Sequence, residues 1–237
     1  MRIKDLNQHR RVLKKEKDHV YDGTDYSAEH LRALKKLKRM PHNEHVLPFT
    51  ASDAAGHETM TEEVDLKNVF ELMRGGAPSA ETLAIIRDCL DGARALAAQG
   101  LVLQDIQSRN LGSMTKDGHR IGVLYDLEGL YPKNTDLKGR IWNKEFTVPE
   151  VALGHVLDLQ PEEMTYQFGR VLEINAPFFA KDLPIETRLE LARLAEDMMA
   201  FDPKAADTTR KRIDLATALA RLDDILQGVV VQKRRTA

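Results

Sequence analysis

Two aspartates and an asparagine in the middle of the chain are of residue types that can hold a metal ion and move a proton. Asp105 and Asn110 lie five residues apart in LVLQDIQSRNLG, and Asp126 follows sixteen residues later in HRIGVLYDLEG. Mg²⁺ prefers hard oxygen ligands and keeps the rest of its shell for water and phosphates. A further carboxylate can orient a hydroxyl nucleophile and accept its proton. The pattern therefore indicates metal-assisted phosphate chemistry.

These three residues need secondary-structure elements that hold them together, and the sequence predicts such elements. A long helix is expected over 79–99, because its apolar residues form one stripe and Gly100 stops it. The segment LVLQDI is predicted to be a short strand or a loop, and 121–125 an apolar strand in a β-hairpin. Asp105 and Asn110 then lie in a loop after a helix, and Asp126 lies at the end of a strand. The alternative is that all three are ordinary turn formers.

The rest of the chain divides into a mixed first part and a helical second part. A helix is expected over 27–40, followed by two short strands in HVLPFTAS and HETMTEEV and a short helix in DLKNVFELM. Residues 129–147 lack periodicity and are predicted to form a loop. Helices are expected over 149–227, and the tail after them is expected to fray.

Composition limits the classes of protein that remain. The 237 residues are 42% hydrophobic, enough for one large domain or two tightly joined lobes. Aromatic residues make up 5%, which argues against a protein that binds single-stranded nucleic acid by stacking its bases on aromatic side chains. No nucleic-acid partner is therefore expected. No apolar run is long enough to span a membrane, and the N-terminal sequence lacks the apolar core of a secretory signal. The single Cys89 excludes an intramolecular disulfide, and a cytoplasmic location is expected.

The charge of the chain is unevenly distributed. Residues 1–40 contain twelve Lys and Arg against six Asp and Glu, although the whole chain has a net charge of −2. A basic segment of this kind is either a solvated helix face or a contact surface for a nucleic acid or an acidic lipid.

Taken in order, these motifs resemble those of the eukaryotic-type protein kinases. The family's catalytic loop H-R-D-x-x-x-x-N is similar to LQDIQSRN, residues 103–110, and its metal-binding D-F-G is similar to DLE, residues 126–128. The resemblance implies that Asp105 is the catalytic residue that orients the acceptor hydroxyl. It also implies that Asn110 and Asp126 hold Mg²⁺ and, through it, ATP.

The resemblance extends downstream and upstream of these motifs. Downstream, the segments similar to the family's A-P-E, Y-S-F-G and D-P motifs are WNKEFTVPE, EMTYQFGRVLEI and MMAFDPK. Upstream, VLKK resembles the strand with the phosphate-contacting lysine, which implies Lys14 in that role and Glu29 as its helix partner. MTEEV resembles the hinge that contacts the nucleotide, through Glu62 and Val64. In so charged a region, Lys14 and Glu29 are equally typical of ordinary surface residues.

The implied fold is α+β: a two-lobed kinase-like domain with a small truncated N-terminal sheet lobe, 1–64, and a larger helical lobe, 65–237. The N-terminal lobe is truncated because no glycine precedes Gly23, so the chain lacks the family's Gly-rich loop over the ATP phosphates. Gln104 replaces the arginine that reads a phosphorylated activation loop, so regulation by loop phosphorylation is not expected.

Two further positions of the catalytic region depart from the family. Leu103 and Met164 replace the histidine and aspartate that brace the catalytic loop, so the bracing is expected to be apolar or to come from Glu163. Glu128 replaces the glycine after the metal-binding aspartate, which adds a carboxylate beside the metal site.

Three functions follow from the resemblance. The first is an ATP- and Mg²⁺-dependent phosphotransferase that acts on Ser, Thr or Tyr hydroxyls of a protein substrate, with an activating partner that covers the open nucleotide cleft. Small bacterial effector or phage kinases have this reduced form, and an effector would be delivered to a host cell. The second is a pseudokinase that serves as a binding or scaffold module, favoured by the missing Gly-rich loop. The third is a small-molecule kinase of the aminoglycoside or choline kinase type, because D-L-E resembles the D-W-E of those enzymes.

Overall fold

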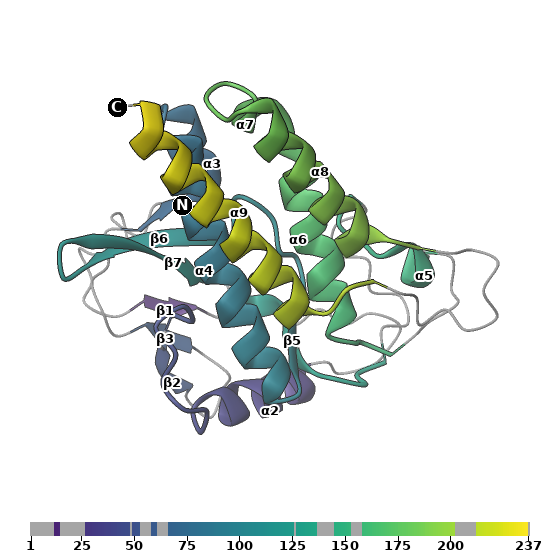
Figure 1. Cartoon of the computed structure of the whole chain (residues 1–237). Helices are drawn as coiled ribbons and strands as arrows, with labels where there is room; N and C mark the ends of the chain where they lie inside the picture. Colours follow the sequence, from purple (N-terminus) through teal and green to yellow (C-terminus); the bar gives the residue numbers. More distant parts are fainter. Residues whose placement is uncertain are drawn as a thin grey trace.

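The computed structural model shows a mixed α+β chain in which short antiparallel strands and longer helices occupy different regions (Figure 1). It describes residues 12–14, 27–47, 49–52, 58–60, 66–125, 127–136, 145–152, 158–201 and 212–236.

The first described strands form a small antiparallel sheet near the N-terminus. Its order is β1-β3-β2, with the strands β1 (Val12–Lys14), β2 (Phe49–Ser52) and β3 (Glu58–Met60). Helix α2 (Ser27–Leu37) stands between β1 and β2 in the sequence and packs against a later strand, β8 (Leu130–Pro132). His30 Nδ1 of α2 lies 2.8 Å from the carbonyl oxygen of Leu130. The N-terminal helix is therefore anchored beside the segment that follows Asp126.

Two more sets of strands frame the middle of the chain. Strands β4 (Lys67–Asn68), β6 (Leu111–Lys116) and β7 (His119–Leu124) form a sheet in the order β4-β6-β7, and β5 (Leu101–Leu103) pairs with β8. All of these ladders are antiparallel. Antiparallel strands with the helices segregated from them define an α+β architecture, so this part of the predicted fold class is confirmed.

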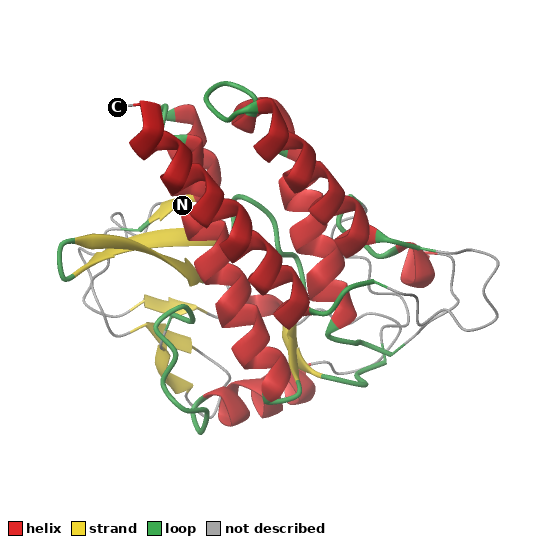
Figure 2. Cartoon of the chain, viewed as in Figure 1, coloured by secondary structure: helices red, strands yellow, loops and turns green. Residues whose placement is uncertain are grey.

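The second half of the described chain is helical. Figure 2 shows long helices gathered beside the β4-β6-β7 sheet. The helices after α2 are α3 (Val69–Arg74), α4 (Ser79–Ala98), the 3₁₀ turn η1 (Leu127–Gly129), α5 (Pro149–Ala152), α6 (Glu162–Ile174), α7 (Ala176–Phe179), α8 (Ile185–Met199) and α9 (Leu215–Thr236). Helix α4 packs against β7 and α9, and α6 packs against α8. Among the described residues, no helix combines the length and apolar character needed to cross a membrane.

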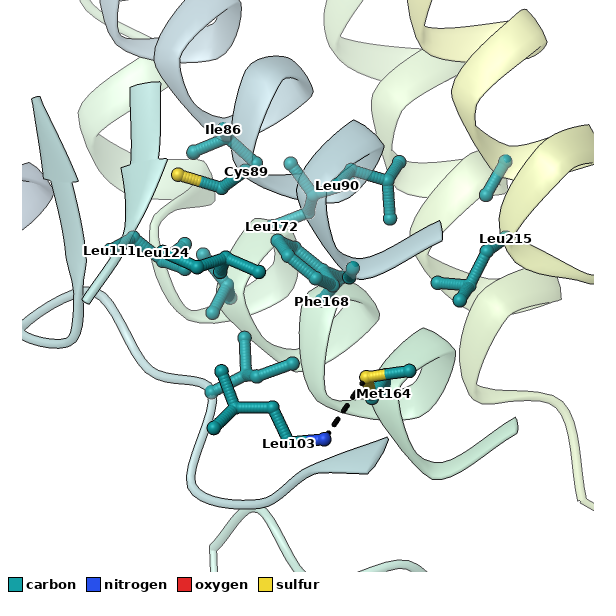
Figure 3. Close-up of a cluster of buried hydrophobic side chains, with 14 of the residues drawn as sticks. Ile86, Cys89, Leu90, Leu103, Leu111, Leu124, Met164, Phe168, Leu172 and Leu215 are labelled. Carbon is teal, nitrogen blue, oxygen red and sulfur yellow. Dashed lines mark hydrogen bonds between the residues drawn. The ribbon is translucent and has the colours of Figure 1, made fainter. Parts of the chain in front are cut away.

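The buried core joins α4 to the hairpin and to the C-terminal helices (Figure 3). The predicted apolar stripe of α4 is confirmed, because its members are all at most 1% exposed: Leu83, Ile86, Cys89, Leu90, Ala93 and Leu96. Phe168 of α6 is fully buried in the same cluster. Burial raises the pKa of the Cys89 thiol well above its usual value, which makes this cysteine a packing residue with no role as a thiolate.

Three details of the structure differ from the sequence-based expectation. The segment 129–147, predicted to be a loop, contains β8, a strand of three residues that is too short to produce an alternating pattern. The tail expected to fray belongs to α9, where Val229 is 2% exposed because it packs into the core. Helix α2 ends at Leu37, three residues before the expected end, because Pro41 disfavours helical backbone just before it. The expected lobe boundary at 64/65 lies outside the described residues and stays a prediction.

Gly122 permits the close contact between β7 and α4. An added Cβ at Gly122 would overlap the backbone carbonyl oxygen of Ile85. We expect Gly122→Ala to lower the free energy of unfolding by about 3 kcal/mol, since overpacking against a backbone atom cannot be relieved by a rotamer change. Urea denaturation followed by circular dichroism measures this change.

Gly228 provides the matched control for this prediction. It lies in α9 and an added Cβ would meet no atom within 4 Å. Gly228→Ala is expected to raise the free energy of unfolding by about 1 kcal/mol through helix propensity. Equal urea midpoints for Gly122→Ala and the parent chain would contradict the packing described here.

Candidate active site

The candidate site is built on the loop of residues 104–110, which joins β5 to β6. Its backbone is unusual at Asp105, which has a φ of 62°. Left-handed backbone is uncommon for residues other than glycine and costs free energy, although Asp and Asn tolerate it best. Two other described residues, Asp117 and Asn134, share this conformation in turns. A left-handed residue therefore indicates a functional site only when its side-chain contacts do so as well.

Asp105 and Asn110 come together as the sequence predicted. The side-chain amide Nδ2 of Asn110 donates to the backbone oxygen of Asp105 at 2.9 Å and to its carboxylate Oδ2 at 3.0 Å. These bonds engage the amide nitrogen and leave Asn110 Oδ1 as the atom with which this side chain would bind a cation. The spacing of five residues thus brings one carboxylate and one amide oxygen to the same place.

Gln107 is a member of this cluster that the sequence did not single out as a site residue. Its Nε2 donates to both carboxylate oxygens of Asp105, at 3.0 and 2.9 Å. Asp105 is therefore held by two neutral amides from its own loop. A neutral glutamine orients the carboxylate without adding charge, and it occupies the oxygens that a hydroxyl substrate would need.

Helix α6 supports the start of this loop through two hydrogen bonds. The backbone amide of Leu103 donates to Met164 Sδ at 3.3 Å (Figure 3). Gln104 Nε2 donates to Glu163 Oε2 at 3.1 Å, and both side chains are buried. Of the two expected kinds of bracing, the one that comes from Glu163 is confirmed.

Two further contacts from the same region hold the rest of the loop, and sequence reasoning missed both. The backbone amide of Ile106 donates to Gln167 Oε1 at 2.8 Å, at a buried position. Asn175, at the end of α6, donates through Nδ2 to Ser108 Oγ at 2.8 Å. The loop is thus tied at three positions to α6 and its C-terminal cap.

We expect Gln167→Leu to loosen this loop, because the buried Ile106 amide would lose its acceptor. Leaving a buried donor unsatisfied costs about 1–3 kcal/mol. Hydrogen exchange at the Ile106 amide is expected to become faster, and the urea midpoint is expected to fall. Gln227→Leu, at an exposed position of α9, is the matched control. Unchanged Ile106 exchange in Gln167→Leu would show that the contact does not hold the loop.

The segment that contains Asp126 is held against this loop on both sides. The Tyr125 hydroxyl donates to the backbone oxygen of Arg109, and the Gln104 amide donates to the Gly129 oxygen at 2.8 Å. An added Cβ on Gly129 would lie 2.7 Å from the Gln104 oxygen, so glycine permits this approach. Asp126 lies outside the described residues, and so does the side chain of Glu128.

Two arginines lie at this loop, Arg109 within it and Arg74 on the neighbouring helix α3. The Phe70 ring of α3 lies under the guanidinium groups of Arg109 and Arg74, at 4.9 and 5.8 Å from the ring centroid. The Phe70 amide donates to the Ser108 oxygen at 3.2 Å, which fixes α3 beside the loop. Two cations at the rim raise the local positive potential and favour an anionic ligand. Sequence reasoning missed this pair because residues on two distant elements supply it.

The remaining predicted site residues are not assembled by the described part of the chain. Lys14 lies at the end of β1, but its side chain is outside the described residues, as are Glu62 and Val64. Glu29 stands in the first turn of α2 and makes no hydrogen bond or ion pair to a side chain that the structure describes. Its pairing with Lys14 therefore stays a prediction.

Metal ligation is likewise untested at this site. Within the described residues, no three His, Cys, Asp or Glu side chains gather in a way that could hold a metal ion. The expected Mg²⁺ site needs Asp126, which is outside them.

In comparisons with known proteins, no protein-family model and no curated protein matches the chain.

Proposed function

We propose that the chain is an ATP- and Mg²⁺-dependent phosphotransferase of the protein-kinase type, with hydroxyl groups of a protein as acceptors. The observation that carries this proposal is the junction of Asp105 and Asn110 through two hydrogen bonds, in a loop tied to buried α6. A carboxylate held at a left-handed backbone position by several contacts is a pre-organised group.

Each residue of the loop then has a defined role. Asp105 accepts the proton of the acceptor hydroxyl or orients that hydroxyl toward the γ-phosphate. Asn110 offers Oδ1 to the cation, and Asp126 supplies the charged ligand. Bound Mg²⁺ neutralises the charge that the phosphate oxygens carry. Arg74 and Arg109 at the rim attract the anionic ligand.

The donor set fits Mg²⁺ in its chemistry. A carboxylate and a carboxamide supply only hard oxygen atoms, and no thiolate or imidazole belongs to the proposed set. The 125–129 segment contacts the 104–110 loop, and these contacts support the proposal that Asp126 and Asn110 belong to one site.

Two described residues near the site argue against regulation by loop phosphorylation. Gln104 is 8% exposed and bonded to Glu163, so it cannot pair with a phosphate as an arginine does. Thr135 is also buried, and its hydroxyl donates to the Pro132 oxygen at 2.7 Å. The active site is proposed to be shaped constitutively, with a partner protein completing the cleft that lacks a Gly-rich loop.

A pseudokinase is the second candidate, and Gln107 favours it. Its amide contacts both oxygens of Asp105 and so competes with a substrate hydroxyl. In the phosphotransferase, Gln107 must move aside when the acceptor binds. In a scaffold it stays in place.

A phosphotransfer assay on dephosphorylated full-length protein tests the proposal. Labelled ATP with Mg²⁺ is supplied with and without cell lysate as a source of acceptor and partner. Transfer to protein without prior loop phosphorylation is the expected result. Nucleotide binding without transfer to protein would redirect the search to small-molecule acceptors, and neither binding nor transfer would support the pseudokinase.

A further inference from the structure

A small pocket lies far from the candidate active site in the sequence, between α6, α7 and α8. Its volume is about 130 Å³, and its lining is mostly apolar. The floor consists of buried side chains, among them Leu172, Phe179 and Leu191. An engineered apolar cavity of about 150 Å³ holds benzene. This pocket therefore has room for one aromatic ring or a short alkyl chain.

One charged side chain on the pocket wall has no hydrogen-bond or ion-pair partner among the residues that the structure describes. Arg188 of α8 lines the pocket, and its Nε atom is buried without a hydrogen bond. Among the described residues, no carboxylate forms an ion pair with its guanidinium. A buried donor without an acceptor is costly and uncommon, and a guanidinium is shaped to bind a carboxylate. Arg188 therefore provides an anion-binding group at the edge of an apolar pocket.

The two longer helices that line this pocket, α6 and α8, also carry exposed large hydrophobic side chains. The large hydrophobic residues exposed in the described chain are Ile174, Ile185 and Leu189, at 39%, 52% and 51%. Ile174 ends α6 next to the lining residue Glu173, and the other two flank Arg188 on α8. Three side chains form a much smaller patch than the ~1,000 Å² that a specific protein interface needs. A small molecule fits this surface better than a folded partner.

Two carboxylates also line the pocket, Glu173 and Glu196, and neither neutralises Arg188. Glu173 is paired with Arg170 and so is already neutralised. Glu196 lies two helical turns from Arg188, about 12 Å along α8, at the opposite end of the lining. The cationic and anionic ends of the pocket are therefore separate, and the cationic end is next to the exposed apolar side chains.

We propose that this pocket binds a small carboxylic acid that carries an apolar group. The apolar group inserts between α6 and α8, and the carboxylate pairs with Arg188. The site is independent of the proposed phosphotransferase activity, and no residue of the 104–110 loop takes part in it.

Binding of 4-phenylbutyrate to the ¹⁵N-labelled full-length chain tests the proposal by NMR titration. The uncharged 4-phenylbutanamide and the cationic 4-phenylbutylamine serve as matched ligands. Chemical-shift changes are expected at α6, α7 and α8, with the acid binding about tenfold more tightly than the amide, as a charge-assisted bond requires. Equal affinity for acid and amine, or shift changes elsewhere, would overturn the proposal.

Three variants separate the contribution of charge from that of shape. Arg188→Gln is expected to reduce the affinity for the acid to that for the amide, while Arg193→Gln, at an exposed position of the same helix, changes neither. Ala192→Phe fills the pocket from an exposed position and is expected to abolish binding of both ligands. Acid binding that survives Ala192→Phe would place the ligand outside this pocket and refute the assignment.

Discussion

Asp105→Asn is expected to reduce phosphoryl transfer by at least about a hundredfold, the loss typical of removing a general base. Asparagine matches aspartate in size and tolerates left-handed backbone, so the loop should keep its φ of 62° at this position. The amide cannot accept the hydroxyl proton. Steady-state transfer from labelled ATP measures the loss, at matched protein concentration.

Two controls separate catalysis from folding in this experiment. Mg-ATP affinity is expected to change by less than about twofold, because Asp105 is not a metal ligand in the proposed site. Asp224→Asn, at an exposed position of α9, should leave transfer unchanged. Transfer retained at the parent level in Asp105→Asn would remove this residue from the catalytic role.

Asp126→Asn is expected to weaken Mg²⁺-dependent ATP binding by at least about tenfold, since changes even to groups behind the ligands cost 10- to 100-fold in metal affinity. The substitution removes the charge from the cation site and keeps the side-chain size. Isothermal titration with ATP, in Mg²⁺ and in EDTA, isolates the metal-dependent part. If Asp126→Asn bound Mg-ATP as tightly as the parent chain, the metal assignment would be wrong.

The elements of this fold that the sequence predicted well are the ones with local signals. The α4 stripe repeats at helical spacing over twenty residues, so its buried face could be read directly. Asp117-Gly118 provides left-handed backbone for the turn between β6 and β7. The short segment from Asp105 to Asn110 limited how far apart the two side chains could lie.

The parts that sequence reasoning missed depend on tertiary packing. Gln167 contacts Ile106 across sixty-one residues of sequence, and its position among the buried residues of α6 carries no periodic signal for a polar role. Strand β8 exists because β5 pairs with it, not because its three residues favour a strand. Val229 is buried because α9 packs on α4. The charged residues that follow Val229 gave no sign of this packing in the sequence.

The candidate site was predictable to the extent that its residues are close in sequence. Asp105 and Asn110 were placed correctly relative to each other, but Gln107 was not recognised as a partner of the carboxylate. A glutamine two residues after an aspartate is common on surfaces, and only the left-handed turn at Asp105 brings its amide back. Arg74 joins the site through Phe70, which no local pattern could show.

Isothermal titration of the dephosphorylated full-length chain with ATP, with and without Mg²⁺, tests the central claim most directly. The proposed function predicts one ATP site per chain whose affinity depends on Mg²⁺ and falls in Asp126→Asn but not in Asp105→Asn. The absence of binding up to millimolar ATP in both conditions, with the chain folded by circular dichroism, would contradict it.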